Sequence, residues 1–537
     1  MAGPAIDPNM RAVEELDALK ESVVSRPARA FRAIPLGHWL LLPVLLLAGI
    51  LRAQELSTMG VSFDESFTQR MVEFSWPEMF DRIARETQPP LFYVLLKLWS
   101  GVFGGSVIAG RILTISLGVA AVGGMYAFVR GAYRLEERAW RKNFVEADLP
   151  ALAAATLLAI APLQIHWDQQ IRMYSLPIAL SLWSSSFLVR ALAGNAAHVG
   201  NWSAYTIAAI LLSYSHYFGL FILMSQFLYA IACRLATGNR NWFDRISPIL
   251  LSGCVLSLAW QPWLAVFLRQ RSGVARDFYL PEPSWDLFGR TVHEVWVGVG
   301  MPLSADQGLL IAELSFLVLA VLALGRRPAD LLVIALATIP VAAAFTISAI
   351  SHPIITARYF LFSHVFVLAA IAVVACRVPW LGRYVAIALI VWILSKPCQD
   401  YLQWREEGAE LPGMQAAVTR IDAARGDAPL VVSNPMLFTS ALTYIQDRDR
   451  VYNFRPPSGF PMYQGTPVMR EEDYVDSEWL RESKAREVWT LGAGGYMGHV
   501  PVPSSWSLVR EKQYPEWFAR LTVRLYTRDG HKESDAK

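Results

Sequence analysis

Long apolar runs are the feature of this sequence that most constrains its fold. The first extends from Leu36 to Leu51, and others that approach a membrane-spanning length begin near residues 110, 149, 173, 202, 218, 246, 307, 330, 358 and 382. A helix of about 20 apolar residues crosses the hydrocarbon core of a bilayer, so we predict an α-helical polytopic membrane protein with about eleven spans.

Composition supports a chain that lies mainly in lipid. Of its 537 residues 54% are hydrophobic, whereas roughly 45–50% is usual in soluble proteins. The net charge of +3 is close to neutral for this length, which argues against a nucleic-acid partner. The four cysteines show no paired short spacing, so neither a zinc knuckle nor a disulfide framework is predicted.

Basic residues predict the orientation of the chain. Residues 1–35 are polar, and three arginines among them directly precede the first apolar run, which has no small-residue cleavage site and is expected to stay as a signal anchor. Positive charge favours the cytoplasmic side, so we predict a cytoplasmic tail over 1–35. Further basic positions expected on that side are Arg130, Arg134, Arg138, Arg141, Lys142, Arg234, Arg240, Arg245, Arg326, Arg327, Arg377 and Arg383.

The segment Leu91 to Gly104 decides whether that orientation is consistent. If it crossed the membrane, the basic loop at 130–142 would be forced outside. The segment is short, carries Lys97 in its middle and follows two prolines, which suits a helix lying along the interface. We predict a juxtamembrane helix here.

The loops that this topology places on the outer face contain the unusual polar residues of the chain. These loops are 53–109, 166–172, 215–217, 269–306 and 351–357. The first contains the adjacent carboxylates Asp64 and Glu65. The spans themselves are almost free of charge at mid-depth, which disfavours an ion or proton pathway through the bilayer.

After the last span the composition becomes charged, and the number of spans places residues 399–537 outside. Apolar periodicity predicts helices at 414–424 and 437–445 and strands at 429–433, 487–491 and 521–526. We therefore expect a small α/β extracytoplasmic domain behind a transmembrane catalytic domain at 36–398.

A transferase at the outer membrane face has little access to cytosolic nucleotide sugars, so its activated group must arrive through the bilayer. A polyprenyl phosphate sugar is such a donor. Transfer needs a base near the acceptor hydroxyl and cationic or hydroxyl groups around the departing phosphate. Asp64 suits the base, and Arg172, Tyr174, Arg358 and Tyr359 suit the phosphate, since the planar arginine fork holds two phosphate oxygens.

Several loop motifs resemble those of the GT-C glycosyltransferases, in the branch of protein O-mannosyltransferases and lipid A aminoarabinose transferase. Phe-Asp-Glu at 63–65 resembles the acidic motif of that branch, and Gln-Pro-Pro-Leu-Phe-Tyr at 88–93 resembles its His-Pro-Pro-Leu-Tyr-Tyr segment. Residues 169–174 resemble Gln-Glu-Ala-Arg-Met-Tyr. His-Tyr-Phe-Gly at 216–219 and Ala-Arg-Tyr-Phe at 357–360 complete the order. The similarity covers about 36–400, with a similar domain behind it.

The resemblance implies a GT-C fold in a plasma membrane of bacterial type, with Asp64 as general base. Glu65 beside it is a second catalytic candidate, the alternative being that it orders the loop or caps a helix. The positions that it implies for substrate and phosphate are Gln88, Asp168, Arg172, Tyr174, His216, Arg358 and Tyr359. Two departures stand out: Gln88 replaces a His, and Gln170 replaces a Glu, so that Asp168 is the only carboxylate of the second loop. Whether a divalent metal is required therefore stays open.

The predicted reaction is an inverting transfer of a sugar from a polyprenyl phosphate donor to a glycolipid such as lipid A, a polysaccharide or a protein. A flippase that moves a lipid-linked saccharide without breaking a bond is the alternative. A binding module with a membrane anchor is a third reading, but an anchor needs only one span.

Overall fold

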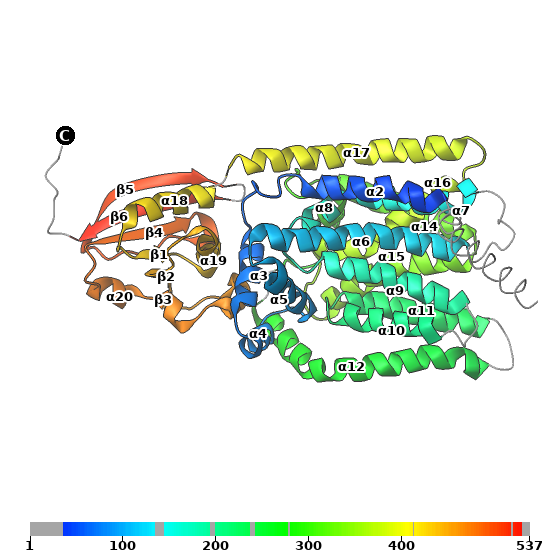
Figure 1. The fold of residues 1–537 in the computed structure, drawn as a ribbon, viewed down its shortest axis with the longest axis horizontal. Coiled ribbons are helices and arrows are strands. Elements are labelled where there is room, and N and C mark those ends of the chain that lie inside the picture. Colours follow the sequence, from blue (N-terminus) through cyan, green and yellow to red (C-terminus); the bar gives the residue numbers. More distant parts are fainter. Residues whose placement is uncertain are drawn as a thin grey trace, which may run out of the picture.

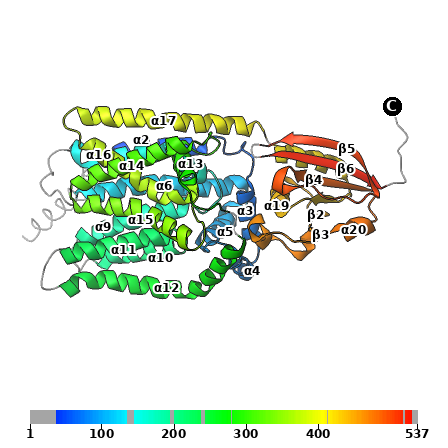
Figure 2. The same cartoon turned by 180° about the vertical axis from the view of Figure 1, so that it is seen from behind.

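The computed structural model describes residues 36–134, 144–193, 199–236, 242–277, 280–411, 413–516 and 519–528. The expected tail at 1–35 and Arg138, Arg141, Lys142 and Arg240 lie outside these residues. Figures 1 and 2 show two parts joined end to end, a long helical bundle and a smaller domain built on a β-sheet.

Long apolar helices that run side by side along one axis form the bundle (Figure 1). They are α2 (Leu36–Ala53), α6 (Val107–Arg134), α7 (Phe144–Ala159), α9 (Ser175–Ala193), α10 (Val199–Ser213), α11 (Gly219–Ala236), α12 (Trp242–Asp277), α14 (Ala305–Leu324), α15 (Pro328–Ile350), α16 (Ala357–Cys376) and α17 (Gly382–Ala409). The predicted helical membrane architecture is confirmed.

The described residues contain nine helices that are long and apolar enough to cross a membrane. A tenth span forms if α7 and the short helix α8 (Pro162–Asp168), which meet at a bend of 64°, count together. The sequence predicted about eleven spans. The difference is α10, whose 15 described residues fall short of the usual spanning length although it packs against α9 and α12 in the bundle.

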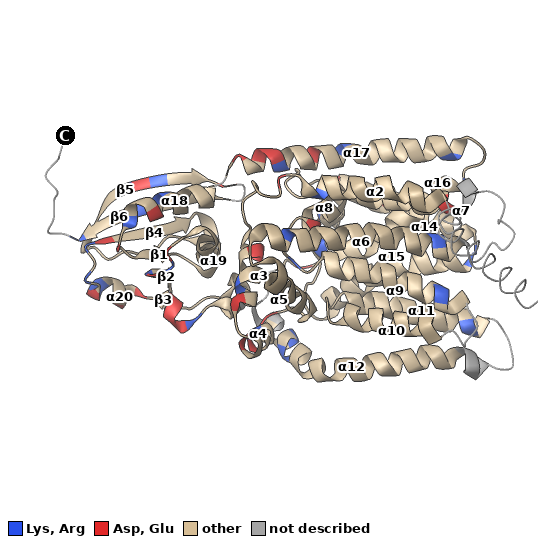
Figure 3. Cartoon of the chain, viewed as in Figure 1, with Lys and Arg blue, Asp and Glu red and all other residues tan. Residues whose placement is uncertain are grey.

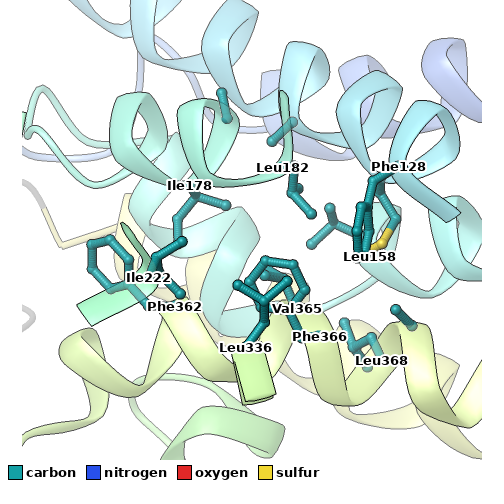
Figure 4. Close-up of a cluster of buried hydrophobic side chains, with 14 of the residues drawn as sticks. Phe128, Leu158, Ile178, Leu182, Ile222, Leu336, Phe362, Val365, Phe366 and Leu368 are labelled. Carbon is teal, nitrogen blue, oxygen red and sulfur yellow. The ribbon is translucent and has the colours of Figure 1, made fainter. Parts of the chain in front are cut away.

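Interlocking apolar side chains fill the centre of the bundle (Figure 4). Phe128 of α6, Leu182 of α9, Leu336 of α15 and Phe366 of α16 are completely buried there. Phe128 and Phe366 meet edge to face, with ring centroids 5.6 Å apart. The charged residues gather at the two ends of the bundle, and its middle is almost free of them, as Figure 3 shows. This distribution is what a lipid environment requires.

Short helices close the end of the bundle that faces the sheet domain. They are α3 (Phe63–Glu73), α4 (Trp76–Ile83), α5 (Leu91–Phe103) and α13 (Trp285–Val297). The helix α5 has 13 residues and is therefore about 20 Å long, too short to cross the roughly 30 Å hydrocarbon core. Lys97 in its middle donates hydrogen bonds to the carbonyl oxygens of Val72 and Phe74, at 2.7 and 2.6 Å. This ammonium caps the end of α3.

The C-terminal domain has a six-stranded mixed sheet in the order β3-β2-β1-β4-β6-β5. The first four strands pair in parallel, and β6 pairs antiparallel with both β4 and β5. Its elements are α18 (Gly413–Arg425), β1 (Leu430–Val432), α19 (Pro435–Tyr444), β2 (Val451–Phe454), β3 (Tyr474–Val475), α20 (Ser477–Glu482), β4 (Glu487–Ala493), β5 (Trp506–Pro515) and β6 (Arg520–Arg528), with short 3-10 turns at Met462–Gln464, Thr466–Val468, Glu471–Asp473 and Gly495–Met497.

Alternation along β1 shows how the two faces of the sheet are covered. Leu430 and Val432 pack with α18 and α19 on one face, whereas Val431 packs with Leu480 of α20 on the other. The two helices and three strands that the sequence predicted are all present, and the structure adds α20, β2, β3 and β5.

An arginine on α4 attaches the sheet domain to the bundle. Arg82 Nη1 donates to the carbonyl oxygens of Pro467 and Met469, at 2.7 and 2.9 Å. The guanidinium carbon also lies 3.8 Å from the centroid of the Phe74 ring. Hydrogen bonds to a charged group each contribute about 1.5–3 kcal/mol, so this side chain is one of the contacts that hold the two parts together, beside the Arg70–Asp473 and Arg448–Glu73 pairs.

Replacing Arg82 tests this attachment. We expect Arg82→Met, which keeps the apolar stem and removes the donors, to speed amide hydrogen exchange over 462–473 by about tenfold or more, the factor that corresponds to a loss of 1.4 kcal/mol. The matched control is Arg85→Met, just after α4, because the pair of Arg85 with Asp81 of α4 is largely exposed and contributes little. Equal exchange in both variants would contradict the role of Arg82.

Candidate functional site

The first turn of α3 carries the two carboxylates that the sequence singled out. Ser62 is its N-cap: the hydroxyl accepts from the Glu65 amide at 3.3 Å, and Glu65 Oε2 accepts from the Ser62 amide at 3.0 Å. This capping box is the reason that the Ser-Phe-Asp-Glu sequence begins a helix. It points Asp64 and Glu65 in different directions.

Glu65 points into the protein and is 1% exposed. Its two oxygens accept from Nε and Nη2 of Arg111 on α6, both at 2.8 Å, and Oε1 also accepts from the Ile171 amide at 3.3 Å. Burial raises the pKa of this carboxyl, but Arg111 and the hydrogen bonds outweigh that effect and hold it below its usual range. Both oxygens of Glu65 are therefore committed to fixing α3.

Asp64 points instead toward the loop between α8 and α9. Its Oδ2 lies 3.7 Å from Nε of Arg172, and its side chain is 27% exposed, against 8% for the arginine. Arg172 Nη1 donates to Thr68 Oγ1, one turn further along α3, at 3.2 Å. The 3.7 Å separation is longer than a hydrogen bond, so Arg172 Nε, which is buried, has no hydrogen-bond partner among the described residues.

Aromatic side chains and a histidine surround this arginine. Tyr174 is buried between Trp167 and His216, with ring centroids 4.4 and 5.7 Å away. His216 lies 5.4 Å from Tyr359, whose ring stacks on Phe218 at 4.4 Å. These rings come from three segments far apart in the sequence.

Electrostatics keep His216 neutral. Burial, together with Arg358 and Arg172, lowers the pKa of His216 to about 3. Its Nδ1 accepts from the Phe218 amide at 3.1 Å, so the neutral ring carries its proton on Nε2. That nitrogen is buried and has no hydrogen-bond partner in the described part of the chain.

Arg358 is the second residue of α16 and lies near these rings. Its guanidinium carbon is 5.7 Å from the Tyr359 centroid, and its charge acts on Tyr174 and His216. The structure therefore brings Asp64, Arg172, Tyr174, His216, Arg358 and Tyr359 to one end of the bundle, beside the sheet domain.

Two predicted site residues have other surroundings. Asp168 on α8 accepts from Arg52 Nε at 2.7 Å, and this pair is almost fully buried. Arg52 therefore already pairs with this carboxylate. Gln88 is 5% exposed, and its side-chain oxygen has no hydrogen-bond partner in the described residues.

Three residues near the site were missed from the sequence. Burial raises the pKa of Glu86, although Arg172 opposes it, and burial likewise raises the pKa of Glu294 against the charge of Arg358. Burial also raises the pKa of Tyr93, so its hydroxyl keeps its proton, and this buried oxygen has no partner among the described residues. Tyr93 is the last residue of the Gln-Pro-Pro-Leu-Phe-Tyr motif, and this motif is the signal from which it could have been identified.

The described residues contain no group of three or more His, Cys, Asp and Glu side chains placed to hold a metal ion. Of the carboxylates in the first two outer loops, Glu65 is bound by Arg111 and Asp168 by Arg52.

Comparison with known proteins places the fold. No protein-family model matches the chain, and no curated protein sequence matches it significantly. Among solved structures it resembles ArnT from Cupriavidus metallidurans in the apo state, with a TM-score of 0.53 at 14% identity over 90% of this chain and 97% of that one. The same protein bound to undecaprenyl phosphate gives 0.51 at 13% identity, with the same coverage of 90% and 97%.

The oligosaccharyltransferase of Archaeoglobus fulgidus in complex with Zn and sulfate gives a TM-score of 0.49 at 12% identity, over 83% of this chain and 67% of that chain. The likeness to the two ArnT structures shows that the chain shares their fold, in agreement with the GT-C fold that its loop motifs predicted.

The Glu65–Arg111 pair gives a test of how the site is built. Removing one member of a buried ion pair costs about 3–5 kcal/mol because the other charge stays uncompensated. We expect Glu65→Met and Arg111→Met each to lower the melting temperature in detergent strongly. The loss of stability in the double variant should be smaller than the sum of the two single losses. Strictly additive losses, measured in one double-mutant cycle, would contradict a direct coupling.

Proposed function

We propose that this protein is an inverting glycosyltransferase that moves a sugar from a polyprenyl phosphate to an acceptor at the extracytoplasmic membrane face. The observation that carries the proposal is the partly exposed Asp64–Arg172 pair, whose charged groups are 3.7 Å apart. Around it lie buried polar atoms of Tyr93, Arg172 and His216 that have no hydrogen-bond partner among the described residues. Buried polar groups are nearly always hydrogen-bonded, so these three donors are suited to a polar ligand.

The charges of the site suit the head of such a donor. Arg172, and Arg358 in the first turn of α16, bring two guanidinium groups to one region, where the helix N-terminus adds partial positive charge. Tyr93 and the Nε2–H of His216 are further donors. Arginine forks hold phosphate oxygens in pairs, so these groups are suited to stabilise the phosphate as it departs.

Asp64 has the position of the base. Its carboxylate is partly exposed and is tied to Arg172 only across 3.7 Å, so one oxygen can accept the proton of an acceptor hydroxyl. The acceptor oxygen then bonds to C1 of the sugar while the bond from C1 to the phosphate oxygen breaks. The proton ends on Asp64 and the electron pair on the polyprenyl phosphate. A single displacement inverts the configuration at C1.

We assign Glu65 to positioning, in place of the catalytic role that the sequence suggested, because Arg111 and backbone amides occupy its oxygens. The solved ArnT complex contains undecaprenyl phosphate, which supports a polyprenyl phosphate as the donor here. Glycolipid, polysaccharide and protein acceptors all satisfy this chemistry.

Helix ends support the proposed orientation. Arg130, Arg234, Arg326 and Arg377 lie at or near helix ends away from the sheet domain (Figures 1 and 3). Positive residues favour the cytoplasmic side, so the sheet domain and the Asp64 site face outward. On this basis we propose a cytoplasmic tail at 1–35, a catalytic domain at 36–398 and an extracytoplasmic domain at 399–537, in a plasma membrane of bacterial type.

Turnover in proteoliposomes tests the proposal. With undecaprenyl phosphate bearing glucose, mannose or aminoarabinose, and glycolipid, polysaccharide or protein acceptors, we expect release of undecaprenyl phosphate from at least one pairing. Asp64→Asn, which keeps the shape of the side chain, should lower kcat by about 10²–10⁴-fold, the usual contribution of a positioned base.

The control is Asp81→Asn, because Asp81 lies exposed on α4 and pairs only with a surface arginine. We expect its kcat to match the wild type. Full activity in Asp64→Asn would exclude Asp64 as the base. Movement of the intact lipid-linked sugar between leaflets, without release of undecaprenyl phosphate from any pairing, would favour a flippase.

A further inference from the structure

The structure contains a cavity of about 410 Å³ on the far side of α3 from Asp64. It lies between α3, α5, the start of α6 and α19 of the sheet domain, which Figures 1 and 2 both show next to one another. Ligand pockets usually measure about 300–1,000 Å³, so this cavity is large enough for a small polar ligand.

The two faces of α3 separate this cavity from the proposed catalytic site. Asp64 and Thr68 lie on one face and contact Arg172. The cavity is lined from α3 by Ser66, Gln69, Arg70 and Glu73. At 100° per residue these four side chains project from the opposite side of the helix, so a ligand here does not occupy the position of the donor.

The charges that line the cavity are balanced. Arg70 pairs with Asp473 at 2.6 Å, and Arg448 pairs with Glu73 at 3.2 Å. Each guanidinium thus has its own carboxylate, and a phosphate would have to displace one. An uncharged ligand fits this lining better than an anion.

Hydroxyl groups around the cavity already use their protons. Ser66 donates to the Phe63 carbonyl at 2.8 Å, Thr439 to the Pro435 carbonyl at 3.1 Å, and Thr443 to the Thr439 carbonyl at 3.3 Å. The Ser66 hydroxyl oxygen also lies 3.3 Å from those of Thr439 and Ser440, and each oxygen keeps a lone pair that can accept one further hydrogen bond. A phosphate oxygen only accepts, whereas a sugar presents many O–H donors, so these hydroxyls favour a sugar.

Exposed apolar side chains lie beside the cavity. Phe103 of α5, on the same face as the lining residue Ser100, and Ile108 of α6, next to the lining residue Val107, are both exposed, and exposed apolar side chains on a membrane protein are suited to contact acyl chains. A ligand that enters here combines a polar head with a lipid tail.

We propose that this cavity is a second binding site, for the uncharged sugar headgroup of a membrane glycolipid. The ligand contacts both α3 and α19, so it joins the sheet domain to the helix that carries Asp64. The inference goes beyond the proposed transfer reaction and does not depend on it, because binding needs neither the donor nor turnover.

Hydrogen exchange of the full chain in nanodiscs tests this site. Three kinds of nanodisc are compared: phosphatidylcholine alone, phosphatidylcholine with diacylglycerol monoglucoside, and phosphatidylcholine with phosphatidylglycerol. In a fourth condition, free maltose is added to the nanodiscs of phosphatidylcholine alone. We expect the glucoside lipid to slow exchange at 439–448 and 96–110 by about tenfold. Phosphatidylglycerol should leave it unchanged.

Variants separate the site from general effects. Thr443→Trp fills the cavity and should abolish the protection, and Thr443→Val, which keeps the shape but loses the acceptor, should weaken it. Ser505→Trp adds the same bulk at an exposed position of the same domain and should keep it. Protection by maltose alone would support the sugar chemistry but assign it to a free saccharide.

No protection by the glucoside lipid would overturn the proposal. Protection by the glucoside lipid that is as strong in both Thr443→Val and Thr443→Trp as in the wild type would also overturn it. Protection by phosphatidylglycerol in place of the glucoside lipid would do the same. None of these outcomes bears on release of undecaprenyl phosphate, so the transfer reaction is judged separately.

Discussion

The buried ion pair between Glu65 and Arg111 is the interaction on which the rest of the site depends. Arg111 lies at the start of a long span, and besides Glu65 it binds the carbonyl oxygens of Leu56, Met59 and Gly60. One side chain therefore fixes the loop before α3, the first turn of α3 and its angle to the bundle. Two charges hidden from water interact strongly only when their geometry is nearly ideal, and here two 2.8 Å contacts provide it.

With its neighbour held in this way, Asp64 is free to face the loop before α9. The same short helix meets the bundle on one side and α19 on the other, so the turn that carries Asp64 lies at the junction of the two parts of the molecule. Lys97 closes the end of this helix from α5, and Arg82 attaches the domain behind it. Neither part alone defines the position of the carboxylate.

Much of this arrangement was predictable from the sequence, because apolar length determines a span and loop motifs occur in a recognisable order. The remainder depends on contacts between residues far apart in the chain. Arg111 and Arg52 resemble ordinary arginines near span ends, and only the fold shows that they neutralise Glu65 and Asp168. The strand β5 was missed because most of its residues are exposed, so its polarity does not alternate. With two residues, β3 is too short for any pattern.

The central claim is that Asp64 and Arg172 face the head of a polyprenyl phosphate donor. A structure of the full chain with undecaprenyl phosphate tests it most directly. We predict phosphate oxygens at about 2.7–3.2 Å from the Arg172 guanidinium, with the Asp64 carboxylate on the side from which an acceptor approaches the phosphate. A phosphate bound at the other end of the bundle, or an Arg172 side chain turned away from it, would contradict the claim.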